Sequence, residues 1–192
     1  MPAVALVLDL LHPPTDEELR RLSAQNPGYR FERTAEGKLV VSPTGGESGR
    51  RSAELLLQLG TWNRRTGLGV VFDASTGFLL PDGSCRSPDA AWVPRARWLA
   101  LSPEERRAFP PLCPDAVFEI RSESDGLSAL RTKLEAYLAN GARLAVLVDP
   151  DRRVVEVFRA GHAPEAHAGV ERVALEPELP GFVLEVGPIF AE

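Results

Sequence analysis

Hydrophobic positions along the chain recur at two spacings, one typical of helices and one typical of strands. The helical spacing is clearest over residues 48–65 and 127–140, and a glycine follows closely after each stretch. A shorter helix is expected after Thr15, because Glu18 follows three residues later, as in a capping box. These patterns predict three helices.

Short apolar runs bounded by turn residues predict the strands. Residues 86–93 and 114–122 each contain such a run, and residues 144–148 are apolar throughout, as in a central strand covered on both faces. The stretch from 117 to 148 is long enough for a right-handed crossover between parallel strands. Further strands are expected over 29–33, 38–41, 70–73, 77–80, 154–158, 170–175 and 182–186. The predicted fold class is α/β, a mixed sheet flanked by helices.

Chain length predicts one domain over residues 1–192, since this length can bury its own core. Within it, residues 1–14 are interpreted as an N-terminal extension and residues 94–114 as an insertion. The second half of the insertion is expected to be helical, because Ser102 precedes Pro103 at the first helical position.

The formal net charge of −5 excludes a strongly basic nucleic-acid footprint over the whole chain, although a local basic groove stays open. Nearly all the positive charge is arginine, and Lys38 and Lys133 are the two lysines of the sequence. Cys85 and Cys113 are isolated, which suits a reducing cytoplasm. The opening apolar run is interrupted by Asp9, so no signal peptide or membrane span is expected. A cytoplasmic location is predicted.

Two carboxylates lie in the apolar runs where a buried strand should avoid them. Asp89 opens the first run, and Glu119 sits inside the second. A buried carboxylate must be paired, protonated or bound to a metal. With Lys133 downstream, the pair suggests a site for Mg²⁺ or Mn²⁺, which prefer oxygen ligands, and the carbonyl of Ile120 is a further candidate ligand. Such a site could activate water for attack on a phosphodiester, with a nearby ammonium orienting that water.

Simpler interpretations remain open for two of the candidates. Lys133 lies at the edge of the apolar stripe of the helix expected over 127–140, where a lysine can cover the core with its stem and extend its ammonium to solvent. Glu47 precedes the helix expected over 48–65, where the helix dipole favours a carboxylate cap. A role for Glu47 in the metal site is the alternative.

An ordered set of short motifs resembles the bacterial Uma family of restriction-endonuclease-like proteins, once labelled a domain of unknown function. The motifs are Ser42-Pro43-Thr44-Gly45-Gly46-Glu47-x-Gly49, Thr76-Gly77-Phe78-x-Leu80-Pro81, Arg86-Ser87-Pro88-Asp89, Phe118-Glu119-Ile120-Arg121-Ser122 and Lys133-x3-Tyr137-x3-Gly141. The resemblance spans residues from about Thr15 to the C-terminus. It implies a restriction-endonuclease-like core of the PD-(D/E)XK nuclease superfamily and Mg²⁺-dependent hydrolysis of DNA by an endonuclease.

The resemblance also implies roles for individual residues. Pro88-Asp89 corresponds to the PD element, Glu119 to the following acid, and Glu47 to an acidic residue of the first core helix that contributes to the metal site. The chain departs from the superfamily pattern at Arg121, where a lysine is expected. In this family the lysine has moved to the following helix, which makes it Lys133 here. Arg121 then either points to the face opposite the site or supplies only a fixed positive charge. Strand alternation places Arg121 on the same face as Glu119, which favours the fixed charge.

A second hypothesis is a catalytically inert interaction module on a nuclease fold. In that case Asp89 and Glu119 are structural and pair with Arg121 or Arg86. Divalent-metal binding separates the two hypotheses.

A symmetric homodimer is the expected assembly, because nucleases of this type often cut one strand with each subunit and C₂ dimers are the commonest oligomers. The segment 95–109 and an exposed strand edge at 154–158 are the candidate contacts.

Overall fold

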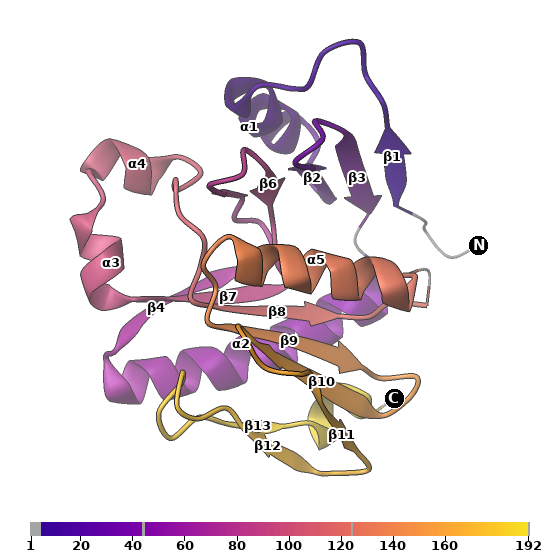
Figure 1. Ribbon diagram of the computed structural model, residues 1–192, viewed down its shortest axis with the longest axis vertical. Coiled ribbons are helices and arrows are strands. Elements are labelled where there is room, and N and C mark those ends of the chain that lie inside the picture. Colours follow the sequence, from indigo (N-terminus) through magenta and orange to yellow (C-terminus); the bar gives the residue numbers. More distant parts are fainter. Residues whose placement is uncertain (1–4, 44, 124, 192) are drawn as a thin grey trace.

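The computed structural model describes residues 5–43, 45–123 and 125–191. Its main sheet has six strands in the order β11-β10-β9-β8-β7-β4 (Figure 1). These strands are β4 (Gly69–Asp73), β7 (Ala90–Pro94), β8 (Ala116–Ile120), β9 (Leu144–Asp149), β10 (Val154–Arg159) and β11 (Glu165–Ala168). Strands β8 and β9 are parallel and the other neighbours are antiparallel, so the sheet is mixed, as predicted.

Two long helices cover the two faces of the main sheet. Helix α2 (Gly46–Thr66) packs on one face through its buried Leu55, Leu59 and Trp62. Helix α5 (Leu127–Ala139) packs on the other face and forms the crossover between the parallel strands β8 and β9. Figure 1 shows α5 and α2 on opposite sides of the strands. The α/β class, both helices and the crossover are thus confirmed.

A second, smaller sheet lies beyond α5 in Figure 1, and its strand order is β1-β3-β2-β6-β5. Its strands are β1 (Leu6–Leu8), β2 (Tyr29–Arg33), β3 (Leu39–Pro43), β5 (Phe78–Leu79) and β6 (Cys85–Arg86). Helix α1 (Asp16–Gln25) buries Leu19 against Phe31 and Leu39 of this small sheet. The predicted capping box at Thr15 is present, and Glu18 completes it.

The strand expected over 86–93 is split between the two sheets, which corrects the prediction. Strand β6 ends in the small sheet and β7 begins at Ala90 in the main sheet, so Asp89 precedes its strand and does not lie within it. Proline has no N–H for a strand ladder, so Pro88 suits this short connection better than a strand interior. The connection places Asp89 where the two sheets meet.

The exposed edge expected at 154–158 is also wrong. Strand β10 is buried between β9 and β11, so its backbone has partners on both sides. Strand β11 was not predicted because its Glu165-Ala166-His167-Ala168 sequence is largely exposed and has no apolar pattern. The edge strands of the small sheet are β1 and β5, and the three residues of β1 are exposed.

The insertion after β7 is helical in both halves, whereas only the second half was expected. It contains α3 (Arg95–Ala100) and α4 (Pro103–Arg107), and Ser102 caps the second of these. Trp98 and Leu101 pack against the body of the protein, as in many surface insertions. Within the described ranges, no helix combines the length and apolar character needed to cross a membrane.

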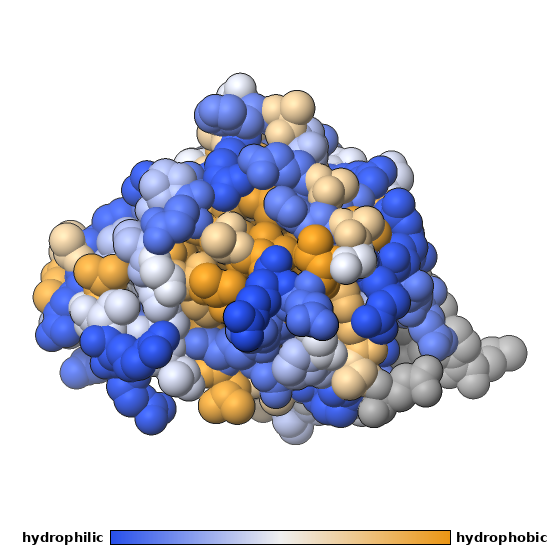
Figure 2. Space-filling view, turned by 90° about the horizontal axis from the view of Figure 1, so that it is seen from below, coloured by the Kyte–Doolittle hydropathy of each residue, from blue (hydrophilic) through white to orange (hydrophobic). Residues whose placement is uncertain are grey.

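The C-terminal part covers the outer side of α2. It consists of the hairpin β12 (Arg172–Ala174) and β13 (Val183–Glu185) and of the short helix α6 (Gly187–Phe190). Figure 2 views the molecule from this end and shows hydrophobic side chains gathered inside a polar rim. Leu57 and Val183 are exposed and line one groove between α2 and β13. This end lies opposite the small sheet in Figure 1.

Candidate active site

Asp89 holds the two sheets together through both oxygens of its carboxylate. Arg30 of β2 donates from Nη1 to Oδ1 at 2.6 Å, and the backbone N–H of Ile120 donates to Oδ2 at 2.7 Å. The Asp89 side chain is 7% exposed. A carboxylate this deeply buried is stable because charged and backbone donors replace its lost water.

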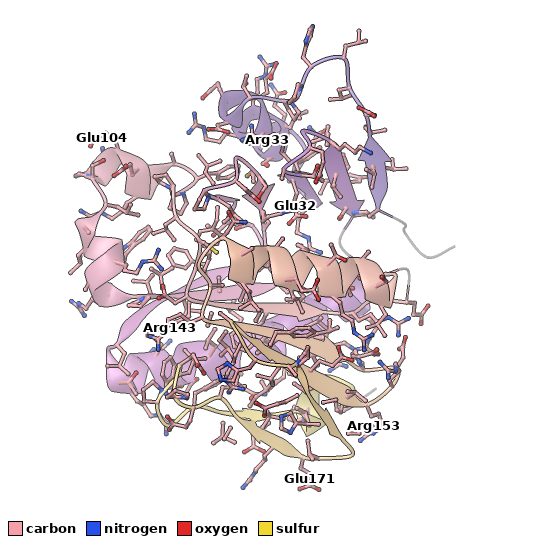
Figure 3. The ribbon with its side chains drawn as sticks, viewed as in Figure 1. Glu32, Arg33, Glu104, Arg143, Arg153 and Glu171 are labelled. Carbon is pink, nitrogen blue, oxygen red and sulfur yellow. The ribbon has the colours of Figure 1, made fainter. Side chains whose placement is uncertain are left out.

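Lys133 lies between two buried glutamates. Its Nζ is 2.8 Å from Oε1 of Glu119 on β8 and 3.0 Å from Oε1 of Glu32 on β2. Tyr137, one turn further along α5, donates its hydroxyl to the same Oε1 of Glu119 at 3.4 Å. Figure 3 labels Glu32 where the small sheet faces α5. Lys133, whose side chain is 16% exposed, is therefore a partner of the predicted acid and not a solvent-directed lysine.

Glu32 has further partners in the connection that carries Asp89. The backbone N–H of Ser87 donates to its Oε1 at 2.6 Å, and Nη1 of Arg86 lies 3.8 Å from its Oε2. Three acidic and three basic side chains thus meet between the sheets. This charged cluster consists of Arg30, Glu32, Arg86, Asp89, Glu119 and Lys133.

Burial and neighbouring charges shift the pKa values of the cluster in different directions. Burial raises the pKa of Glu119 to about 7 despite the nearby Lys133, and the charge of Asp89 adds to the rise. Burial acts in the same way on Glu32, but Lys133, Arg86 and the Ser87 amide outweigh it and lower its pKa. Burial disfavours the Lys133 ammonium, yet Glu119 and Glu32 together raise its pKa. Glu32 and Lys133 are therefore charged at neutral pH, whereas Glu119 titrates there.

A pocket of about 320 Å³ opens beside the cluster. Arg30, Asp89 and Ile120 line one part of it, and the beginning of α2 with Glu47 and Arg51 lines another. The side chain of Glu47 is 62% exposed and forms ion pairs with Arg51 at 3.5 Å and with the neighbouring arginine of the same turn. Asp89 thus belongs to both the cluster and the pocket.

The structure brings the predicted site residues to one end of the main sheet. Asp89, Glu119 and Lys133 belong to the charged cluster, while Ile120 and Glu47 line the adjoining pocket. Sequence reasoning missed Arg30 and Glu32. Their only local signal is a spacing of two on a predicted strand, which puts both on one face.

Arg121 does not supply charge to this site, contrary to the expectation from strand alternation. Strand β8 ends at Ile120, so the alternation does not continue to the next residue. Arg121 instead donates from Nη1 to Asp149 at 3.1 Å and from Nε to the carbonyl oxygen of Asp125. The pairings of Asp89 or Glu119 with Arg121 or Arg86 are wrong as well, because Arg30 and Lys133 take those places.

The donor set fits a hard divalent cation in its chemistry. Asp89 and Glu119 offer carboxylate oxygens, and Ile120, which lines the pocket, has a backbone carbonyl that is the further candidate ligand. Across the described ranges, no group of three or more His, Cys, Asp or Glu side chains is arranged to hold a metal ion. Arg30 and Lys133 already contact the two carboxylates, so a bound cation would compete with these two side chains.

Comparison with protein families matches residues 16–187 to the Uma2 family model, described as "Putative restriction endonuclease". The chain belongs to the Uma2 family. The predicted family is therefore confirmed, and the match includes every residue of the charged cluster. A comparison with curated proteins gave no match.

A solved structure shares the fold of this Uma2 chain. It is described as the crystal structure of "a putative nuclease belonging to DUF820" from Anabaena variabilis ATCC 29413. The TM-score is 0.74 at 19% sequence identity, over 93% of this chain and 98% of the other. At this identity the likeness establishes a shared fold. The description of the Uma2 family supports a nuclease.

Proposed function

We propose that the protein is a DNA endonuclease that uses Mg²⁺ or Mn²⁺ to hydrolyse phosphodiester bonds. One observation carries the proposal: Asp89, which lines the pocket, is close enough to Glu119 for its charge to act on that carboxyl, and Glu119 lies 2.8 Å from the ammonium of Lys133. Two carboxylates, a lysine and an open space are the groups that metal-dependent phosphodiester hydrolysis requires. Membership in the Uma2 family supports the same activity.

Each residue has a distinct role in this proposal. Asp89, Glu119 and the carbonyl of Ile120 hold the ion, which would supply an acidified water and neutralise charge on the phosphate. The ammonium of Lys133, 2.8 Å from Glu119, orients the attacking water or stabilises the negative charge that develops. Glu47 assists from the beginning of α2 across the same pocket.

One specific contact favours the second candidate, an inert interaction module. Arg30 lies 2.6 Å from Asp89 and thus satisfies the carboxylate without any metal. If this pairing persists in the presence of Mg²⁺, then the charged cluster only joins the two sheets. An isothermal titration with Mg²⁺ or Mn²⁺ decides between the candidates, because a module of this kind would give no heat of binding.

A homodimer and a cytoplasmic location remain parts of the proposal. With β10 covered, the insertion with α3 and α4 is the remaining candidate contact, and its Leu99 is 54% exposed. Sedimentation equilibrium at micromolar concentration tests the dimer, and a monomeric mass would contradict it.

The activity is tested on supercoiled plasmid and on a short single-stranded DNA, each with Mg²⁺, Mn²⁺ or EDTA. Asp89→Asn should abolish metal-dependent cleavage, and Lys133→Ala should reduce it to a slow residual rate. Asp73→Asn is the matched control, because this exposed acid at the end of β4 is outside the charged cluster. Cleavage that persists unchanged in Asp89→Asn would exclude this site.

A further inference from the structure

Glu32 is a buried carboxylate to which the family motifs assign no role. It lies on β2 in the small sheet, whereas Asp89 and Glu119 lie at the main sheet and Lys133 on α5. The Glu32 side chain is 8% exposed, so its charge has been removed from water. A buried ionised glutamate is costly unless charged or hydrogen-bonding partners compensate it. Its partners therefore indicate what it does.

The position of the Glu32 carboxylate is fixed from more than one side. The Ser87 amide donates to Oε1 at 2.6 Å, and Arg86 approaches the other oxygen at 3.8 Å. The third partner is the Lys133 ammonium, 3.0 Å from Oε1. The lysine comes from another layer of the protein, so this contact joins the small sheet to α5.

Glu119 alone would define the position of the Lys133 ammonium poorly. Lysine has a flexible four-carbon stem and a compact charge that can rotate about a single acceptor. The Glu32 carboxylate is a second acceptor, and it restricts the ammonium to a position within hydrogen-bonding distance of both carboxylates. Because Glu32 and Glu119 come from different sheets, their spacing depends on how the sheets pack and not on either side chain alone.

We propose that Glu32 is a positioning residue, which fixes the Lys133 ammonium beside Glu119 for the cleavage step. The inference rests on the proposed nuclease function, in which Lys133 orients water or stabilises charge. Glu32, like Glu119 and Lys133, is not among the residues that line the pocket, and it contacts the proposed machinery through the Lys133 ammonium. Its effect on cleavage therefore passes through Lys133.

Because the sequence has only two lysines, the ammonium position can be measured without an activity assay. The full-length protein is labelled with acetic anhydride, and peptide mass spectrometry follows Lys133 against the exposed Lys38. In Glu32→Gln the acetylation rate of Lys133 relative to Lys38 should rise on the order of tenfold, because one charge-assisted hydrogen bond is lost. The glutamine keeps an acceptor for the Ser87 amide.

Glu156→Gln is the matched control for this experiment. Glu156 is also a buried glutamate that accepts from a cation of α5, since Arg131 donates from Nε at 2.8 Å. Replacing Glu156 removes one ion pair from α5 and leaves both glutamate partners of Lys133 in place. The relative acetylation rate of Lys133 should therefore stay at the wild-type value in this variant.

A kinetic cycle separates positioning from general stabilisation. Glu32→Gln should lower kcat about tenfold with KM within about twofold, since the lysine acts on the chemical step. In a Lys133→Met background, with slow residual cleavage measured at high enzyme concentration, the same change should have no further effect. Glu32→Asp, one methylene shorter, should recover part of the kcat.

An unchanged acetylation rate of Lys133 in folded Glu32→Gln would overturn the proposal. It would also be overturned if Glu32→Gln lowered kcat by the same factor in the wild-type and the Lys133→Met backgrounds. If Glu32→Gln does not fold, Glu32→Asp replaces it, with an expected rise in acetylation of about threefold. If the wild-type protein cleaves no DNA, the proposed nuclease function fails independently of the contact between Glu32 and Lys133. The acetylation ratios then still show whether Glu32 holds the ammonium.

Discussion

Arg30 of the small sheet forms an ion pair with Asp89, which directly precedes β7 of the main sheet, with 2.6 Å between Nη1 and Oδ1. Both residues also line the pocket beside the charged cluster. A guanidinium thus binds the carboxylate that is proposed to hold a metal ion. The pair makes the competition between an internal cation and an added divalent cation directly measurable.

We expect Arg30→Gln to lower the free energy of unfolding by about 1–3 kcal/mol, because Asp89 loses a charged partner in a buried setting. Added Mn²⁺ should then raise the melting temperature of the variant more than that of the wild-type protein. Differential scanning fluorimetry with and without Mn²⁺ measures both effects. An identical response to Mn²⁺ in the two proteins would argue against Asp89 as a ligand.

Arg172→Gln provides the comparison for that variant. Arg172 also pairs with an acid, Glu185, but its side chain is 69% exposed. Such surface pairs contribute little, so the free energy of unfolding should change by no more than about 0.5 kcal/mol. The response of this variant to Mn²⁺ should equal that of the wild-type protein.

The two faces of α2 should differ sharply in their tolerance to truncation. Leu59 is fully buried against the main sheet, so Leu59→Ala should lower the free energy of unfolding by about 2–5 kcal/mol. Leu57 on the same helix is 64% exposed, and Leu57→Ala should cost no more than about 0.5 kcal/mol. Urea unfolding followed by circular dichroism gives both values.

The ion pair between Arg131 and Glu156 should make stability depend on pH. The hydrogen bond from Arg131 lowers the pKa of Glu156, although burial opposes it. Because the folded-state pKa lies below the unfolded value, this stabilisation is present above an unfolded pKa of about 4.3 and is lost as pH falls through the folded value. The stability difference between wild-type protein and Glu156→Gln should therefore shrink from pH 6 towards about pH 3.

Urea titrations of both proteins across this pH range measure the difference. If the difference in stability stayed constant down to the lowest pH, Arg131 would not lower the pKa of Glu156 in the folded protein. A gap that widens on acidification would contradict the direction of the pKa shift.

The elements that sequence alone could predict are those with a long periodic pattern. Helix α2 and helix α5 repeat their apolar positions over several turns, and β9 is apolar from Leu144 to Val148. The carboxylates Asp89 and Glu119 were also visible, because Asp89 opens one apolar run and Glu119 interrupts another. Such signals come from residues that are neighbours in the sequence, so they can be recognised without a structure.

The features that sequence could not predict depend on packing between the sheets. Nothing in the segment around Arg30 or Glu32 shows that Asp89 and Lys133 lie opposite, because those residues are far away along the chain. The same holds for Arg121, whose partner Asp149 lies on the neighbouring strand. Alternation along β8 gave the wrong face, because the strand ended one residue earlier.

The small sheet has a consequence for any shortened form of the protein. A fragment that began at α2 would still contain every site residue that the family resemblance implies, from Glu47 to Lys133. It would nevertheless lack Arg30 and Glu32, so Asp89 would have no guanidinium and Lys133 only one of its two glutamates. Arg30 and Glu32 are thus part of the electrostatic balance of the site, and the residues from Glu47 to Lys133 are not sufficient to rebuild it.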